Sequence, residues 1–157
     1  MTIAQRRFAA AAGLGLMMLL VGCGGGASPS SDAAAGDGNV VRVTLQEWSV
    51  LATPDGASAG EVTFQVTNEG PDDVHEFVVI RTELNPTELP FLLTGQVDET
   101  AAGITVITEI EDIPVGETRE VTATLDSGPY VLLCNIYSES EQEAHYQMGM
   151  RLPFPVD

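Results

Sequence analysis

Few side chains in this 157-residue sequence offer the imidazole or thiol groups that bind transition metals. There are two histidines and two cysteines. Cys134, His145 and Met150 lie close together in the sequence, and His75 lies in an earlier, largely apolar segment. If Cys23 is not available for a disulfide, Cys134 has no partner. Its thiol is then either packed in the core or held by a metal. Taken one at a time, such histidines, cysteines and methionines are most often structural.

The first 22 residues have the organisation of a secretory signal peptide. Arg6 and Arg7 precede an uncharged apolar run, Phe8 to Val21, that is short and rich in Ala and Gly for a membrane-spanning helix. The run ends in LVGC at residues 20–23, which resembles the bacterial lipoprotein box, in which the cysteine is acylated and becomes the first mature residue. The alternative is a spanning helix that buries Cys23. We predict export, removal of residues 1–22, and a lipid on Cys23 that anchors the protein to the outer face of the cell membrane.

The remaining chain divides into a tether and one domain. After Cys23, residues up to 39 are mostly glycine, serine, alanine, proline and aspartate, a composition typical of flexible linkers. Residues 40–157 then form the domain, 157 − 39 = 118 residues, which is long enough for a core of its own.

Apolar and polar residues alternate along much of this domain, as they do in half-buried β-strands. The strand segments are expected near residues 41–45, 62–66, 74–80, 104–110, 121–125, 130–135 and 150–156. Only Asn85 to Leu93 has a helical pattern, and Pro90 should keep that helix short. About seven or eight strands separated by turns predict an all-β sandwich or barrel. Trp48, Phe64 and Phe77 are the expected aromatic fillers of its core.

The charge distribution excludes one class of partner. The chain has 6 basic and 23 acidic residues, and two arginines lie in the signal, so the mature charge is near 4 − 23 = −19. Binding to nucleic acid requires a basic surface, which this composition does not supply. A basic redox protein would be attracted electrostatically, although the acidity is equally compatible with solubility alone.

Three segments resemble those that hold the metal in cupredoxins, the type 1 blue copper proteins. VHEFVV at 74–79 is similar to the strand of the first histidine, GPYVLLCN at 128–135 to the strand before the cysteine, and HYQMGM at 145–150 to the second histidine and the methionine. The turn IPVGET at 113–118 also occurs in that family, and the similarity is greatest to its plastocyanin–azurin and sulfocyanin-like branches. The resemblance implies a Greek-key β-sandwich, one copper ion bound by His75, Cys134, His145 and a methionine, and one-electron transfer.

The chemistry of these donors agrees with the resemblance. Two imidazoles and a thiolate with a weak thioether form blue-copper sites, and the metal would hold Cys134 as a thiolate. Met150 is preferred as the axial ligand because the Gly149–Met150 pair resembles the commoner family pattern, with Met148 as the alternative. The 145 − 134 − 1 = 10 residues between Cys134 and His145 exceed the usual gap. We expect the acidic part of this insertion to bulge into solvent while its ends stay in place.

The sequence therefore favours an electron carrier between extracytoplasmic redox partners. Two alternatives remain open, which are a copper-binding or delivery protein without an electron-carrier role and a cupredoxin-like structural module. Enzymatic activity is not expected. Two histidines are too few for the oxygen-reducing cluster of a multicopper oxidase, and no serine lies in a nucleophile motif.

Overall fold

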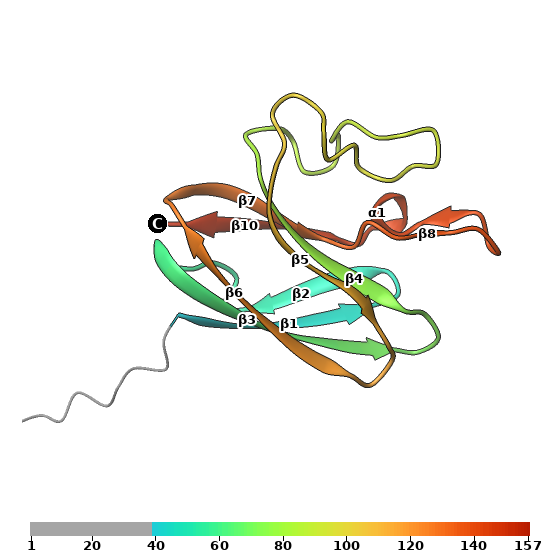
Figure 1. The fold of residues 1–157 in the computed structure, drawn as a ribbon, viewed down its shortest axis with the longest axis horizontal. Helices are drawn as coiled ribbons and strands as arrows, with labels where there is room; N and C mark the ends of the chain where they lie inside the picture. The colour runs from blue at the N-terminus through green and yellow to red at the C-terminus, as the bar shows by residue number, and fades with distance from the viewer. Residues whose placement is uncertain (1–38) are drawn as a thin grey trace, which may run out of the picture. The chain divides into compact units, whose positions relative to one another are not determined.

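The computed structural model describes residues 39–157, so the predicted signal peptide, Cys23 and most of the predicted linker lie outside the described residues. The described part consists mainly of strands (Figure 1). Its elements are β1 (Val40–Gln46), β2 (Ser49–Thr53), β3 (Gly60–Gly70), β4 (His75–Arg81), β5 (Thr105–Ile113), β6 (Thr118–Leu125), β7 (Gly128–Leu133), β8 (Tyr137–Ser138), β9 (Glu143–Ala144), α1 (His145–Met148) and β10 (Arg151–Val156). Among these elements, no helix is long and apolar enough to cross a membrane.

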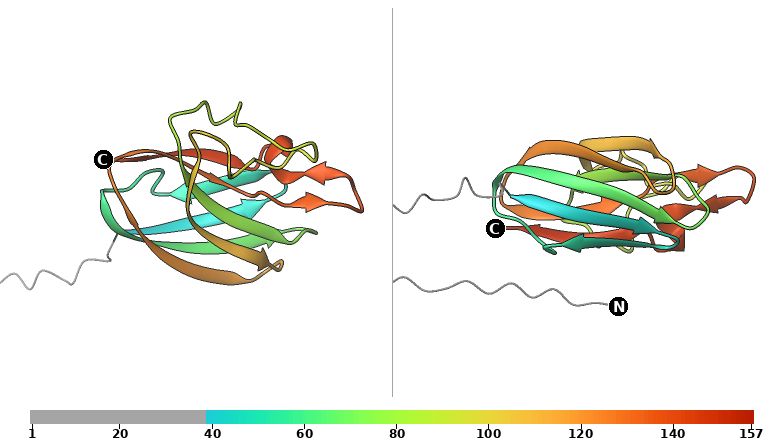
Figure 2. Two further views of the ribbon diagram at one scale, coloured as in Figure 1. Left: turned by 45° about the horizontal axis from the view of Figure 1, so that its top comes forward. Right: turned by 90° about the horizontal axis from the view of Figure 1, so that it is seen from below.

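Eight of these strands form two four-stranded sheets that pack face to face. The strand orders are β2-β1-β3-β6 and β10-β7-β4-β5, and Figure 2 shows the two sheets as separate layers. Neighbouring strands are antiparallel except β1 and β3, which are parallel. The remaining short strands, β8 and β9, pair with each other as a hairpin. The predicted all-β sandwich of seven or eight strands is confirmed.

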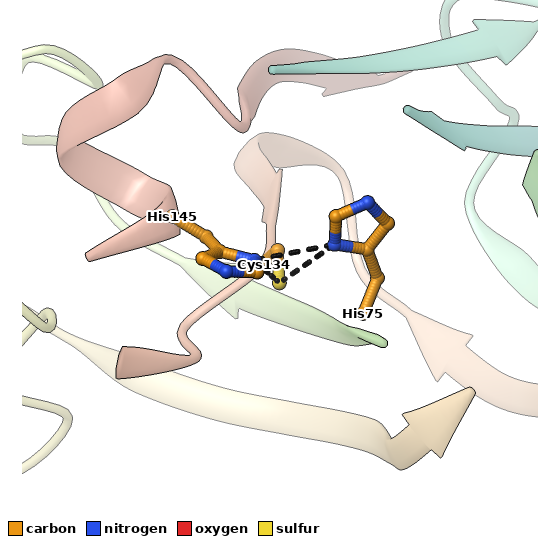
Figure 3. A group of neighbouring side chains, drawn as sticks. All are labelled: His75, Cys134 and His145. Atoms are coloured by element: carbon orange, nitrogen blue, oxygen red, sulfur yellow. Dashed lines mark hydrogen bonds between the residues drawn. The ribbon is translucent and has the colours of Figure 1, made fainter. Parts of the chain in front are cut away.

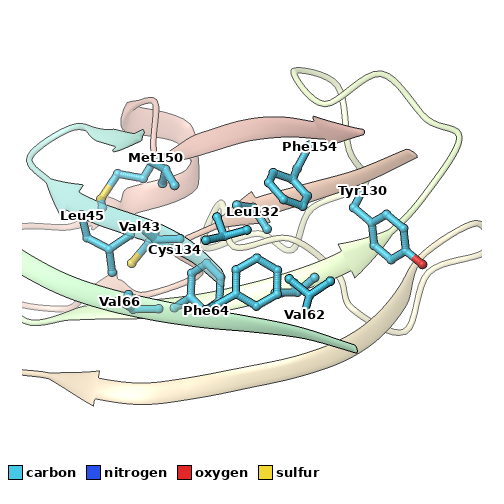
Figure 4. Close-up of a cluster of buried hydrophobic side chains, with 14 of the residues drawn as sticks. Val43, Leu45, Val62, Phe64, Val66, Tyr130, Leu132, Cys134, Met150 and Phe154 are labelled. Atoms are coloured by element: carbon cyan, nitrogen blue, oxygen red, sulfur yellow. The ribbon is translucent and has the colours of Figure 1, made fainter. Parts of the chain in front are cut away.

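The hydrophobic core lies between the two sheets because alternate side chains of each strand point inward. In β1 the three inward-facing aliphatic residues are at most 1% exposed. At the centre, the ring of Phe64 lies 5.2 Å from that of Phe77 and 5.8 Å from that of Phe154, measured between centroids. Burying each such side chain contributes about 1.5–3 kcal/mol. Figure 4 shows that Cys134 and Met150 belong to the same cluster.

The predicted helix at Asn85–Leu93 is wrong, because this segment forms turns in the structure. Pro90 has no N–H to donate and disfavours helical backbone at Leu89. The side chain of Asn85 accepts hydrogen bonds from the N–H and the hydroxyl of the residue two positions later, which competes with helical bonding. The segment is fixed to the domain instead, since the buried Leu89 donates its N–H to the hydroxyl of Tyr146 at 3.1 Å.

The second sheet brings the residues suited to metal binding to one end of the sandwich. β4 and β10 both pair with β7 and run antiparallel to it. The first residue of β4, His75, therefore lies beside the end of β7, which Cys134 follows directly. β10 also begins at this end, and α1, which starts with His145, precedes it.

Candidate metal centre

The side chains of His75, Cys134 and His145 converge at this end of the sandwich (Figure 3). The Nδ1 atoms of the two histidines are 3.2 Å apart. The sulfur of Cys134 lies 3.9 Å from Nδ1 of His75 and 3.4 Å from Nδ1 of His145. All three residues are at most 1% exposed. Folding thus brings into one buried cluster three predicted site residues that lie up to 70 positions apart in the sequence.

A buried asparagine fixes the turn that precedes His75. Asn68, in β3, donates through Nδ2 to the carbonyls of Asp73 and Ile113, both at 2.8 Å. Its Oδ1 accepts the N–H of Gly70 at 2.8 Å. Because the amide of Asn68 is hydrogen-bonded at both ends, its complete burial is compatible with a stable fold. The turn and the pairing of His75 with Ile113 together set where the imidazole lies.

Cys134 is held by hydrogen bonds from two directions. Its N–H donates to the carbonyl of Met150 at 3.1 Å, so the segment before β10 lies directly alongside it. Its sulfur accepts the N–H of Glu76, the residue after His75, at 3.3 Å. A hydrogen bond donated to sulfur favours the anionic thiolate over the neutral thiol. This hydrogen bond partly opposes the effect of burial, which disfavours the thiolate.

The ten residues between Cys134 and His145 form a small hairpin. In it Tyr137 pairs with Ala144, and residues 139–142 at its tip are exposed. Figure 1 shows the hairpin extending beyond the two sheets. The N–H of His145 donates to the carbonyl of Ile136 at 3.0 Å, so the hairpin closes at the histidine itself. The insertion extends into solvent, as expected, and its ends remain fixed.

Of the two candidate axial methionines, Met150 is the one inside the core. Met150 is 0% exposed, and Figure 4 shows its sulfur at the same end of the core as that of Cys134. Met148, in α1, is 42% exposed. The N–H of Met150 donates to the carbonyl of His145 at 3.1 Å. Between the two methionines, Gly149 has φ +127°, and a Cβ there would lie 3.0 Å from a backbone carbonyl, so glycine is required.

Burial makes both imidazoles weak bases and the thiol a weak acid. Burial, together with repulsion from His145, lowers the pKa of His75 to about 4. Burial also lowers the pKa of His145, although carboxylates including Asp73 and Glu141 oppose this effect. Burial raises the pKa of the Cys134 thiol to about 12. At neutral pH the imidazole nitrogens therefore have lone pairs to offer a metal, whereas the thiol releases a proton when it binds one.

The three donors fit one transition-metal ion. Atoms bound at about 2.0–2.3 Å to a shared ion lie roughly 3–4 Å from one another. The three separations in the cluster, 3.2, 3.4 and 3.9 Å, agree with this spacing. The ion would be held by Nδ1 of His75, Sγ of Cys134 and Nδ1 of His145, and the thioether of the buried Met150 is the candidate for a weak fourth donor. This donor set matches that of blue-copper sites.

Sequence analysis misses the role of Glu47 and Trp48, which follow β1. Trp48 was expected to be a core filler, and it does pack against the core, but its ring also lies edge-on to that of His145 with centroids 5.1 Å apart. Glu47 lies against His75, 3.5 Å from its Nε2. An acidic–aromatic pair between two strands is a common sequence, so no local signal could have identified either residue.

The residue after the cysteine, Asn135, also has a structural role that sequence analysis misses. Its Oδ1 accepts the N–H of Val97 at 2.6 Å, and its Nδ2 donates to Glu99 at 2.8 Å. The backbone carbonyl of Asn135 accepts a further hydrogen bond from Gln96 at 2.9 Å. These bonds fasten the long segment between β4 and β5 to the residue beside Cys134.

We expect Met150→Leu to raise the reduction potential of the copper-loaded protein and Met148→Leu to change it little. Loss of the axial thioether leaves Cu(II) with one donor fewer, while leucine preserves most of the buried volume. The equilibrium constant for reduction should rise roughly tenfold, which corresponds to an increase of about 59 mV in the one-electron reduction potential. Protein-film voltammetry of both variants checks this. A larger shift for Met148→Leu would assign the axial position to that exposed residue.

An acidic hollow on the surface adjoins the site. Glu76 lines it together with Glu99, Glu109 and Glu111. Burial, reinforced by the negative charges of these three residues, raises the pKa of Glu76 to about 7. A carboxyl group whose pKa is higher in the folded than in the unfolded state stabilises the fold fully at pH values below its pKa in the unfolded state. That contribution is lost as the pH rises through the folded pKa.

We therefore expect Glu76→Gln to stabilise the metal-free protein increasingly as the pH rises from about 4.5 to above 7. At pH 8 the gain should be about 1 kcal/mol, after allowance for solvent screening of a partly exposed carboxylate. Urea unfolding at pH 4.5 and pH 8 measures the difference. Exposed Glu61 supplies the control, since Glu61→Gln should change the free energy of unfolding by less than about 0.5 kcal/mol at either pH. Equal effects of Glu76→Gln at both pH values would contradict the expectation.

Comparison with known proteins finds similar solved structures without a matching sequence family. No family model matches the chain, and no curated protein matches it. Auracyanin from the photosynthetic bacterium Roseiflexus castenholzii is 17% identical with a TM-score of 0.51, over 76% of this chain and 97% of that one. Auracyanin A, a "blue" copper protein from the green thermophilic photosynthetic bacterium Chloroflexus aurantiacus, is 18% identical with a TM-score of 0.50, over 75% and 98%. A rusticyanin variant is 18% identical with a TM-score of 0.51, over 76% and 79%.

These similarities define the class of the domain. The chain has the cupredoxin fold, as its sequence motifs predicted. At one end of that fold lies the buried cluster of His75, Cys134 and His145.

Proposed function

We propose that this protein is a mononuclear type 1 copper protein that carries single electrons between redox partners outside the cytoplasm. The observation that carries the proposal is the convergence of two imidazole Nδ1 atoms and one thiol sulfur at the end of a cupredoxin-fold sandwich. When bound there, copper would supply reversible one-electron exchange between Cu(II) and Cu(I).

The residues around the cluster suit such a site. His75 is held by strand pairing, and Cys134 is held by hydrogen bonds to Met150 and Glu76, so the donors need little rearrangement when the charge changes. All three side chains are buried, and Cys134 and Met150 belong to the hydrophobic core. Both histidines are buried, but only His145 is among the residues that line a hollow on the surface beside the cluster. We therefore propose that redox partners dock over His145.

Loading the protein with one equivalent of Cu(II) tests the proposal. We expect stoichiometric binding, an intense visible thiolate-to-copper band, and reversible loss of that band on reduction. A colourless and tightly bound Cu(I) form that resists oxidation would instead indicate copper delivery. A folded protein that binds no copper would leave a structural module as the remaining function.

The acidic surface around His145 supports a basic redox protein as the partner, such as a cytochrome or an oxidase domain. Asp72, Asp73 and Asp112 line the hollow that contains His145. The hairpin adds further acidic side chains on the same side, and the whole chain has a formal charge of −17. A cationic partner would be attracted to this end of the sandwich, which is where the electron must enter or leave.

We also propose that the protein is exported and held at the outer face of the cell membrane by a lipid on Cys23. The support is the apolar run that ends in LVGC at residues 20–23, together with the glycine- and serine-rich segment after it. Stable attachment requires more than one acyl chain. An anchored carrier would remain near membrane-bound redox partners.

A further inference from the structure

Two buried polar atoms lack hydrogen-bond partners, and they belong to neighbouring side chains. One is His75 of the candidate metal centre, and the other is Glu47. Among the described residues, Nε2 of His75 and Oε2 of Glu47 are the buried side-chain nitrogen and oxygen atoms that lack a partner. The same Nε2 lies 3.5 Å from the other carboxylate oxygen, Oε1 of Glu47, slightly beyond the usual hydrogen-bond range of about 2.7–3.2 Å. The two side chains are 0% and 10% exposed. Since a buried polar atom without a partner destabilises the fold, a hydrogen bond between the two side chains is favoured.

The carboxylate of Glu47 is held in place from the opposite side. Its Oε1 accepts the N–H of Asp73 at 2.8 Å and the N–H of Asp72 at 3.2 Å. Burial by itself would raise the pKa of Glu47, but these backbone donors outweigh it and the pKa is lowered. Both donors belong to the turn that leads into His75, so the imidazole and the carboxylate are fixed to the same short stretch of backbone.

We propose that Glu47 is a positioning residue that acts on the metal through His75. It accepts the Nε2–H of the imidazole and so selects the tautomer whose Nδ1 lone pair faces Cys134 and His145. Its negative charge also favours the more highly charged oxidised ion over the reduced one. Histidines that bind metals usually donate their second ring N–H to such a partner, which fixes the ring and increases its basicity.

This inference rests on the proposed copper function but concerns a residue that binds no metal itself. A purely structural role for Glu47 would consist of fastening the turn at Asp72 and Asp73. Glu47→Gln separates the two roles, because its amide oxygen can keep the hydrogen bonds to the turn and to His75 while the charge is removed. Glu47→Ala removes both. The matched control is Glu69→Gln at an exposed carboxylate that accepts a hydrogen bond from Gln46 at 3.1 Å.

The test combines metal affinities with a direct view of the imidazole. Competition with chelators of known affinity measures Cu(I) and Cu(II) binding, and ¹H–¹⁵N NMR of the Zn(II)-loaded protein follows the ring N–H groups. In the wild type, the Nε2–H of His75 should exchange slowly with solvent. Glu47→Gln should retain this protection and lose roughly tenfold in Cu(II) affinity, with a smaller loss for Cu(I). Glu47→Ala should lose the protection and up to about 100-fold in Cu(II) affinity, the range found for outer-shell partners of metal ligands.

Two results would overturn the inference. One is a freely exchanging Nε2–H of His75 in the wild type, and the other is a ratio of Cu(II) to Cu(I) affinity that Glu47→Gln leaves equal to that of the wild type and of Glu69→Gln. If Glu47→Ala does not fold, the wild type and Glu47→Gln still decide the question. A wild type that binds no copper would refute the proposed function instead, and the Zn(II) spectrum would still test the contact between His75 and Glu47.

Discussion

Replacing Cys134 by serine is expected to abolish the visible band of the copper-loaded protein. The thiolate is the donor that produces this charge-transfer band, and a serine hydroxyl does not replace it. Copper affinity should fall roughly 100- to 1,000-fold, if a binding free energy like the roughly 10–16 kcal/mol of structural zinc sites is shared among four donors. Visible absorption and competition with a chelator measure the two effects. A variant that kept the full band would refute the assignment of Cys134 as the sulfur ligand.

The fold should survive this substitution, so the loss can be attributed to the site. Cys134 is completely buried, and burying a hydroxyl in its place costs about 1–3 kcal/mol. The serine oxygen can still accept the N–H of Glu76 that now bonds to sulfur. Far-ultraviolet circular dichroism should therefore remain that of a β-protein. Cys23→Ser serves as the control, since it removes the other cysteine of the chain and should leave the band unchanged.

Changing Glu139, Glu141 and Glu143 together to glutamine should slow electron transfer with a cationic redox partner roughly tenfold at low salt. The first two are exposed at the hairpin tip and the third is partly buried in β9, immediately before Ala144 and His145. Exposed charges are screened over about 10 Å at 0.1 M salt, so the difference should shrink as salt is added. Stopped-flow measurements across a salt series test this, and equal rates at every salt concentration would remove the hairpin from the docking surface.

A second triple variant tests whether position matters beyond net charge. It neutralises three exposed residues away from the hairpin, by the substitutions Asp55→Asn, Glu61→Gln and Asp126→Asn. Glu61 lies at the start of β3, and Asp126 follows β6, whose end pairs with that start. This control should slow the reaction much less than the hairpin variant. The copper spectrum should stay the same in both, because none of the six side chains is among the proposed donors. Equal slowing by both variants would indicate a general charge effect without a docking site.

The donor residues could be found from the sequence because histidine and cysteine are rare in this chain. With two histidines and one cysteine outside the N-terminal region, few alternative clusters were possible. The β-strands were predictable for a related reason, since alternation of apolar and polar residues is a local property of the chain. The helix expected at Asn85–Leu93 failed because the spacing of its leucines did not reveal the turn bonding of Asn85 or the contact between Leu89 and Tyr146.

The sequence by itself determined the fold class, the donor types and the order in which they occur along the chain. Only the tertiary structure decided that Met150 is buried and Met148 exposed, that the insertion before His145 is a hairpin, and that Glu47 lies behind His75. The reason is physical. Strand patterns and donor chemistry are carried by neighbouring residues, whereas the contact between Glu47 and His75 joins the turn after β1 to the start of β4 and depends on backbone hydrogen bonds from the turn before β4. Such long-range packing leaves no periodic signal in a single sequence.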